Sequence, residues 1–485
     1  SFETSGSVNL SFGNTSNFNP TNSTFDWAGN LVGQTAVNAL NNGTSFNYRM
    51  LNENIFRYSN TFGDKHDFSV LAGHSLIYNR NDGFSGSLQG FPTNALQEFN
   101  AGGVLNPNVG GGASEEAVQS FFSRVNYIYD GKYLLELNVR SDGSSKFGPT
   151  NRYATFPSAS AGWRIIEEKF MRNVNWLSDL KLRASWGITG NDNIGNYIFD
   201  QTYNTGLDYF LGTNTIVSAV AVTRLANPTI RWEKVEQYDI GLDAGFFRNR
   251  LSVTADYFQR MSSDVLYGNF PIPASIGVTS LAAQNAASML NSGVELAVNY
   301  RGNFKGLNYS VGASMSKFAD NEVTGLGDRG IETINNESII RIGVPFNAYF
   351  GYKAVGIFQT AAEVAAAPKQ FGSNFTAPGD IQYADLSGPD GKPDGVIDAL
   401  DRTVIGNPYP SMIYNFNTSL SYKGFDFNVV FEGLNGLDRI LNDNGQQPME
   451  GDRNNALAYW IDRWTPQNPS AKLPRLGGQN NARIS

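Results

Sequence analysis

The sequence contains no cysteine and only two histidines, His66 and His74, among its 485 residues. Without cysteine the chain forms no disulfide, no thiolate metal site and no cysteine nucleophile. The two histidines stand eight residues apart on one predicted strand and its turn, too far apart at about 3.3 Å per residue to bind one metal ion together. The sequence also has no Gly-x-Ser-x-Gly elbow and no phosphate-binding glycine loop. We therefore expect that the protein is not an enzyme.

Charge and long apolar runs are also scarce. Charged residues make up 16% of the chain, the net charge is -8, and no long Lys/Arg run is present. These features argue against a nucleic-acid partner, because binding to a phosphate backbone needs a basic footprint. No run of eighteen apolar residues occurs, which excludes a membrane-spanning helix and leaves crossing by strands open.

Alternation of apolar and polar residues is abundant instead. In "FFSRVNYIYDGKYLLELNVRSD", residues 121–142, Tyr and Leu alternate with Arg, Glu and Asn on both sides of Asp130-Gly131, which predicts a β-hairpin. The same pattern predicts thirteen strands, mostly about ten residues long, which is close to the length of a tilted membrane strand. They lie near 5–12, 46–59, 67–78, 119–129, 132–142, 152–165, 180–190, 236–246, 251–260, 292–301, 307–317, 413–422 and 425–433.

Connections between these strands alternate between short and long, which is typical of an up-and-down transmembrane barrel with long outer loops. The short turns are flanked by aromatic residues, as a membrane-interface belt requires: Tyr127, Tyr129, Tyr133, Phe246, Tyr300, Tyr309, Tyr422 and Phe425. We therefore expect Leu135, Leu137, Val139, Leu182, Leu242 and Val253 to face lipid. The alternative is a β-sandwich, in which the same side chains would form a core.

Charged residues recur on the opposite face of the predicted strands: Asp239, Asp243, Asp256, Arg124, Arg140, Lys181 and Arg183. We interpret them as a hydrated, charge-balanced barrel wall in preference to a substrate site. The long connections carry aromatic residues suited either to stacking on sugars or a partner, or to anchoring the loops: Tyr203, Tyr209, Phe210, Tyr349, Phe350 and Tyr352. The sequence names no substrate-binding residue.

One long connection, at about 318–412, contains "DGKPDGVIDALD" at 390–401, which matches an EF-hand calcium loop in part. Gly395 holds the sharp-turn position, whereas Lys392 occupies a ligand position that an ammonium cannot fill. The candidate calcium ligands are Asp385, Asp390, Asp394, Val396, Asp398 and Asp401. The alternative is an acidic turn without metal, and the two interpretations have similar weight.

Several stretches resemble the barrel of the SusC-like TonB-dependent outer-membrane transporters. The most recognisable is "SFFSRVNYIYDGKYLLELNVRSDGSSKFGPTNRYATFPSASAGWRIIEEKFM" at 120–171. Similar pieces occur at 176–197, 227–258, 291–301 and 379–433, whereas the first hundred residues match loosely through "HDFSVLAGHS". The resemblance covers most of the chain from about residue 119 onward.

The resemblance implies an all-β antiparallel barrel of 22 strands with an N-terminal plug, in the outer membrane of a Gram-negative bacterium. It also implies TonB, ExbB and ExbD as the energy source and a SusD-like surface lipoprotein as a partner. We expect residues 1–485 to be one partial barrel domain of a longer protein, without the plug or the closing strands. The implied function is import of an oligosaccharide or peptide. The alternatives are a non-transporting receptor or adhesion barrel, and a secreted β-rich binding protein.

Overall fold

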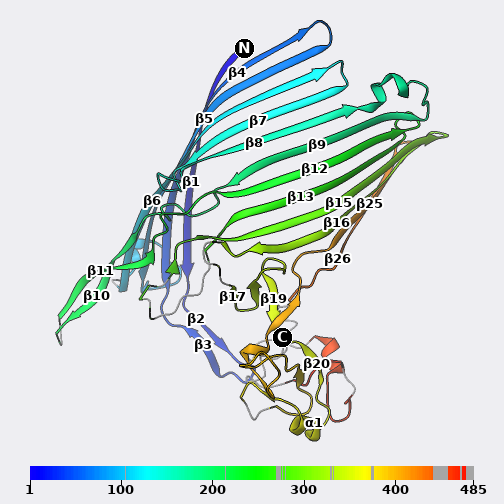
Figure 1. The fold of residues 1–485 in the computed structure, drawn as a ribbon. Helices are drawn as coiled ribbons and strands as arrows, with labels where there is room; N and C mark the ends of the chain where they lie inside the picture. Colours follow the sequence, from blue (N-terminus) through cyan, green and yellow to red (C-terminus); the bar gives the residue numbers. More distant parts are fainter. Residues whose placement is uncertain are drawn as a thin grey trace. The chain divides into compact units, whose positions relative to one another are not determined.

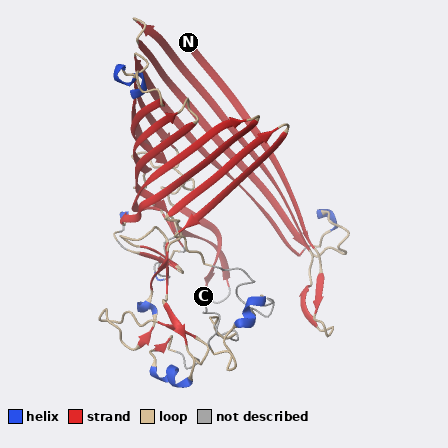
Figure 2. Cartoon of the chain, turned by 90° about the vertical axis from the view of Figure 1, so that its right-hand side faces the viewer, coloured by secondary structure: helices blue, strands red, loops and turns tan. Residues whose placement is uncertain are grey.

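The computed structural model of the chain consists mainly of strands, with a few short helices (Figure 2). It describes residues 1–103, 105–212, 215–268, 275, 277–278, 280–327, 330, 332–372, 376–440, 457–469 and 472–476. Among these residues, no helix combines the length and apolar character needed to cross a membrane.

A large antiparallel sheet contains thirteen strands that follow one another in chain order (Figure 1). Each predicted strand coincides with one of them, although 132–142 and 152–165 extend one residue beyond β7 and β8, and the chain order confirms the up-and-down prediction. The strands are β1 (Phe2–Asn19), β4 (Ala39–Phe62), β5 (His66–Gln89), β6 (Leu105–Tyr129), β7 (Tyr133–Ser144), β8 (Tyr153–Arg164), β9 (Leu177–Asn191), β12 (Glu233–Phe246), β13 (Leu251–Tyr267), β15 (Gln284–Phe304), β16 (Leu307–Gly325), β25 (Met412–Tyr422) and β26 (Phe425–Asn435).

The predicted strand lengths were wrong at the end that carries the long connections. β4 and β5 each contain 24 residues and β6 contains 25, whereas the predicted spans 46–59, 67–78 and 119–129 contain 14, 12 and 11. The added parts are rich in Gly, Asn and Ser, so their sequence lacks a clear alternation of apolar and polar side chains. Backbone hydrogen bonds continue through these parts all the same, because ladder pairing does not depend on that alternation.

The short turns have the backbone that tight hairpins need. Asp130 and Gly131 both have positive φ, at 52° and 66°, and the Lys132 N–H donates to the Tyr129 carbonyl at 2.9 Å. Lys423 and Gly424 repeat this pattern between β25 and β26. Two consecutive positive φ values match the right-handed twist of the flanking strands and favour Asn, Asp or Gly.

The apolar side chains of the strands are exposed on one face of the sheet. Leu135, Leu137 and Val139 of β7 are 43–45% exposed, and Leu182 and Leu242 are 40% exposed. Val253 is partly buried. A sandwich would bury these side chains in its core, so the exposed face excludes that alternative. We call this side of the sheet the apolar face, and the opposite side the polar face.

The chain divides into two compact units. The first contains Ser1–Val174, Leu180–Ile240 and Asp264–Asn285; the second contains Asn175–Asp179, Gly241–Ser263 and Ala286–Ser485. The expected single domain at 1–485 stays a prediction. In the first unit a core forms from residues of β8, of the short connection between β7 and β8, and of two long connections: Phe147, Phe156, Ile198, Ile230, Trp232, Ala282 and Ala283. This unit also contains β2 (Asn22–Phe25), β3 (Leu31–Thr35), β10 (Thr202–Leu211), β11 (Thr215–Leu225) and β14 (Ser280–Leu281).

In the second unit the described part of the 318–412 connection is folded around Ile339, Ala348 and Phe350. Arg475 pairs with Asp380 at 2.6 Å, which joins this connection to residues further along the chain. Its short elements are β17 (Thr333–Asn335), β18 (Ser338–Ile340), β19 (Ala348–Gly351), β20 (Ala354–Ile357), α1 (Ala361–Ala366), β21 (Lys369–Gln370), β22 (Ile381–Tyr383), β23 (Val396–Ile397) and β24 (Thr403–Gly406). Residues 328–329, 331 and 373–375 of this predicted loop lie outside the described residues.

Candidate binding site on the polar face

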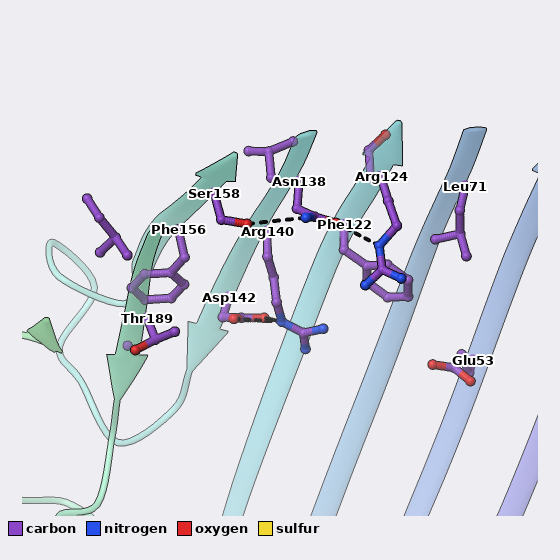
Figure 3. Close-up of a pocket in the computed structure, with 14 residues that line it drawn as sticks. Glu53, Leu71, Phe122, Arg124, Asn138, Arg140, Asp142, Phe156, Ser158 and Thr189 are labelled. Carbon is purple, nitrogen blue, oxygen red and sulfur yellow. Dashed lines mark hydrogen bonds and ion pairs between the residues drawn. The ribbon is translucent and has the colours of Figure 1, made fainter. Parts of the chain in front are cut away.

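A hollow of about 640 Å³ lies on the polar face of the first unit, over strands β4 to β9. Figure 3 shows its side chains, with Arg124, Asn138 and Ser158 joined in a row and Arg140 beside Asp142. Its lining combines charged, amide, hydroxyl and aromatic groups: Glu53, Leu71, Phe122, Ser123, Arg124, Asn138, Val139, Arg140, Asp142, Phe156, Ser158, Ile188, Thr189 and Gly190. This mixture suits a polar ligand that carries apolar groups.

Strand register brings most of these side chains together. Arg124 of β6 pairs with Asn138 of β7, and Asn138 pairs in turn with Ser158 of β8. Directly paired residues of antiparallel strands point to the same face, so the three polar groups form a row across the strands. The Arg124 Nε donates to Asn138 Oδ1 at 2.7 Å, and the Asn138 amide donates to Ser158 Oγ at 3.2 Å.

Two glycines make room for the aromatic rings of the hollow. A Cβ at Gly73 would lie 2.4 Å from the Phe122 ring, and a Cβ at Gly190 would lie 2.1 Å from the Phe156 ring. A side chain at either position would therefore displace a ring. Phe122 also lies 5.3 Å from the Arg140 guanidinium, in cation–π geometry.

The hollow contains charged groups with unused hydrogen-bonding capacity. Arg140 is held by Asp142 at 2.7 Å and by Ser120 at 2.7 Å. Within the described part of the chain, the terminal guanidinium nitrogens of Arg124 and the carboxylate of Glu53 have no hydrogen-bond partner. A ligand carboxylate matches the planar fork of Arg124, and a ligand ammonium or hydroxyl matches Glu53.

A second hollow of about 530 Å³ lies on the same face and contains Lys181, Arg183 and Asp239. Arg183 pairs with Asp239 at 3.1 Å. Both hollows thus contain charged residues that the sequence had suggested for a barrel wall, whereas Asp243 and Asp256 line neither. Sequence reasoning missed Glu53, Phe122 and Phe156. The alternation carried a signal for Phe122, because it has the same parity along β6 as Arg124.

The aromatic residues of the long connections have two different surroundings. Tyr203, Tyr209 and Phe210 of β10 are exposed, so stacking on a ligand or a partner stays a prediction for them. Phe350 is buried beneath the guanidinium of Arg402, at 4.7 Å. Tyr349 lies beside it on β19, and Tyr352 packs edge-on against Phe371 at 4.8 Å. The loop-anchoring interpretation is therefore confirmed for Phe350 and Tyr352.

The two histidines lie on the apolar face and have separate partners. His66 Nδ1 is 2.7 Å from the Tyr127 hydroxyl, and His74 Nε2 is 3.1 Å from the Gln119 amide nitrogen. The expectation that they are ordinary strand residues agrees with these contacts.

In the predicted calcium loop, several carboxylates bind backbone N–H groups. Asp401 is buried and accepts from Leu386 N at 2.7 Å, Ser387 N at 3.0 Å and Asp398 N at 2.8 Å. Asp385 accepts from Gly395 N at 2.7 Å. Among the residues that the structure describes, no three His, Asp or Glu side chains gather in a metal-binding arrangement.

The calcium site stays a prediction for Asp385, Asp390, Asp394, Val396, Asp398 and Asp401. A site of this kind should bind weakly, with Kd on the order of 10⁻⁴ to 10⁻³ M. Calorimetric titration of the full-length protein with Ca²⁺, compared with the variant Asp394→Ala, measures this affinity. Absence of binding at millimolar Ca²⁺, with unchanged hydrogen-exchange protection of residues 385–401 on chelation, contradicts the prediction.

Comparison with known proteins gives a consistent result. Residues 1–435 match the family model described as TonB dependent receptor-like, beta-barrel. TonB-dependent receptor P3 of Formosa agariphila is 31% identical over 446 residues, covering 89% of this chain and 43% of that protein. TonB-dependent receptor SusC of Bacteroides thetaiotaomicron is 28% identical over 406 residues, covering 79% of the chain and 37% of that protein.

Among solved structures, the RagAB peptide transporter matches 98% of this chain with a TM-score of 0.81 and 27% identity. The match covers 50% of that structure's chain. The chain thus spans about half the length, or less, of the proteins that it resembles.

Proposed function

Because the chain belongs to the TonB dependent receptor-like β-barrel family, we propose that it forms part of an outer-membrane transporter that imports a large nutrient. The proposed nutrient is an oligosaccharide or a peptide. Its proposed partners are a SusD-like surface lipoprotein over the outer opening and the TonB–ExbB–ExbD complex in the inner membrane. The similarity to SusC and to the RagAB peptide transporter supports this proposal.

The observation that carries the proposal within this chain is the hollow between Glu53 and Arg124. Its unused donors and acceptors lie on the polar face, and the rings of Phe122 and Phe156 line the same hollow. A peptide offers carboxylates, ammonium groups and apolar side chains together, so this hollow favours a peptide over a neutral oligosaccharide. The hollow does not contain a nucleophilic side chain paired with a general base, which is the arrangement that would indicate catalysis.

Uptake by intact cells tests the proposal. Cells that produce the full-length protein should take up an isotope-labelled casein digest, and deletion of TonB should abolish this uptake. Uptake that persists without TonB contradicts active transport. Surface binding without uptake in either strain favours a non-transporting receptor or adhesion barrel, and a protein that stays soluble without detergent favours a secreted binding protein.

The substitution Arg124→Gln should lower peptide uptake at limiting peptide concentration about tenfold, because it removes a charge-assisted hydrogen bond worth roughly 1.5 to 3 kcal/mol. We expect KM for uptake to rise with little change in maximal rate, since Arg124 binds the ligand and does not drive transport. Arg172→Gln is the matched control, because Arg172 is exposed in the connection between β8 and β9. Equal uptake by both variants would remove the hollow from the proposal.

We also propose that the 318–412 connection lies outside the cell. A protease added to intact cells should then cut within this segment, or find it covered by the lipoprotein partner. The segment "VPFNAYFGYKAVGIFQT" at 344–360 carries enough aromatic and β-branched residues to pack, so cleavage should be restricted to a few exposed sites. Cleavage only after the outer membrane has been permeabilised would reverse this topology.

A further inference from the structure

A row of polar and aromatic side chains crosses the apolar face of the first unit. Between this row and the short turns lies a band of apolar side chains, such as Leu135, Leu137 and Val139, which we call the apolar band. Each strand from β1 to β12 in the large sheet, except β7, contributes one residue, and we call these residues the polar row: Thr4 of β1, Asn54 of β4, His74 of β5, Gln119 of β6, Tyr153 of β8, Trp186 of β9 and Glu236 of β12. Thr4, Asn54 and His74 are direct register partners. The row is therefore built by strand pairing.

Hydrogen bonds join members of the polar row to one another. Thr4 Oγ1 donates to Asn54 Oδ1 at 2.6 Å. The Tyr153 hydroxyl donates to Gln119 Oε1 at 2.7 Å, and the Gln119 amide lies 3.1 Å from His74 Nε2. To reach Gln119, Tyr153 crosses β7 at Gly143, where a Cβ would lie 2.4 Å from the tyrosine ring.

The second part of the row is arranged in the same way. Trp186 Nε1 and the Tyr238 hydroxyl both donate to Glu236 Oε1, at 2.8 Å each. Phe121, beside the row on β6, is 50% exposed, and Tyr153 is 51% exposed. The row thus presents amide, imidazole and carboxylate groups together with exposed faces of aromatic rings.

The distance from the short turns to the polar row equals one membrane crossing. The segment from Asn54 to Phe62 of β4 contains nine residues, and the segment from His66 to His74 of β5 also contains nine. The segment from Gln119 to Tyr129 of β6 contains eleven residues. A transmembrane strand needs about 9 to 11 residues, so the apolar band between these ends has the required length.

We infer that the polar row lies at the outer edge of the hydrocarbon layer and binds the sugar headgroup of a membrane glycolipid. The inference rests on the proposed outer-membrane location. Amide and carboxylate oxygens accept hydrogen bonds from sugar hydroxyls, and the exposed rings of Phe121 and Tyr153, with the half-buried ring of Trp186 beside them, can pack on the apolar faces of sugars. Hydrogen-bonding groups avoid hydrocarbon and aromatic rings favour the interface, which places the row at that boundary.

The charges on this face favour a sugar over a phosphate. The polar row contains no Lys or Arg. Arg80, further along β5 on the same face, is already paired with Asp82 at 2.8 Å and with Glu115 at 2.6 Å. Phosphate recognition relies on cationic donors that remain available to the ligand. The parts of β4, β5 and β6 beyond the row would then stand outside the hydrocarbon layer.

Single-cysteine spin labels test the depth, because residues 1–485 contain no native cysteine. Any cysteine elsewhere in the full-length protein is first replaced by serine. Labels at Leu137→Cys, Ser141→Cys and Met50→Cys of the full-length protein in lipid vesicles are exposed to oxygen and to a water-soluble nickel chelate. Oxygen should dominate at position 137, both reagents should act at 141, and the chelate should dominate at 50. A label at 50 in hydrocarbon overturns the inference, whereas a label at 137 in water overturns the membrane location itself.

Glycolipid retention tests the binding. The full-length protein is placed in phosphatidylcholine nanodiscs containing digalactosyldiacylglycerol, a glycolipid with an uncharged sugar headgroup, and bound glycolipid is counted by native mass spectrometry. The double variant Gln119→Ala/Tyr153→Phe should retain about tenfold less, as expected for the loss of two hydrogen bonds. Tyr127→Phe is the control, because it removes a phenol hydroxyl at the short-turn end.

Glu236→Gln provides a second variant with the same carbon skeleton, and it should also reduce retention. Normal retention in the double variant and in Glu236→Gln overturns the inference. Peptide uptake by these variants is measured in parallel. Normal peptide uptake with lost glycolipid retention separates the polar row from the proposed transport function.

Discussion

The substitution Leu137→Arg should destabilise the full-length protein in lipid by about 2 to 4 kcal/mol, the cost of placing arginine near the middle of the membrane on the lipid side of a strand. Leu137 is 44% exposed on the apolar face, midway between Tyr133 at the short turn and Gly143 beside the polar row. Arginine at this position would place a guanidinium in hydrocarbon. The free energy of unfolding in lipid vesicles, measured by urea titration, reports the cost.

Asn138→Arg is the matched control, since residue 138 is the next residue of β7 and lies on the polar face. Water reaches this face, so the expected cost is about 1 kcal/mol or less, mainly from the lost bonds to Arg124 and Ser158. Equal losses of stability at positions 137 and 138 would be incompatible with an apolar face in lipid.

The substitution Asp401→Ala should lower the free energy of local opening of the segment at 385–401 by about 3 kcal/mol. Asp401 is 1% exposed, and its two oxygens accept from three backbone N–H groups. Alanine would leave these donors without a partner, and each unsatisfied buried donor costs roughly 1 to 3 kcal/mol. Hydrogen exchange at the amides of Leu386, Ser387 and Asp398 measures the opening.

Asp390→Ala is the control for this change, because Asp390 is exposed in the same segment. Its effect should lie within about 0.5 kcal/mol. If Asp401→Ala leaves the protection of the three amides unchanged, the carboxylate does not hold the segment together.

The same contacts predict how stability depends on pH. Burial raises the pKa of Asp401, but the N–H groups of Asp398, Ser387 and Leu386 outweigh burial and hold the pKa below its ordinary value of 3.8. Because the folded pKa is depressed, the contribution of Asp401 is fully present above the unfolded pKa and is lost as the pH falls below about 4. Asp401→Asn should remove this part of the acid sensitivity.

Folding and the proposed site have a common origin in the register of β6, β7 and β8. The pairing that places Leu137 opposite Ala159 on the apolar face also places Asn138 opposite Ser158 on the polar face. A shift of one residue in this pairing would exchange the two faces. The register that keeps Leu137 on the apolar face therefore also keeps Arg124, Asn138 and Ser158 side by side on the polar face.

The sequence by itself determined the strands of the large sheet, their order and their two faces. Apolar and polar residues alternate with period two, and dipeptides such as Asp130-Gly131 and Lys423-Gly424 adopt the positive φ that tight hairpins need. These signals are local, so thirteen strands and the exposure of Leu135, Leu137 and Val139 followed from them.

Only the tertiary structure decided where the strands end and which side chains meet. The outer halves of β4, β5 and β6 are held by backbone pairing between residues far apart in sequence. The composition of these segments does not predict that they form strands. The hollow likewise unites Glu53 with Arg124 through two intervening strand pairs, and Gly73 makes space there for Phe122. Such contacts depend on register across several strands, and the sequence of one strand does not predict which residues of more distant strands lie near it.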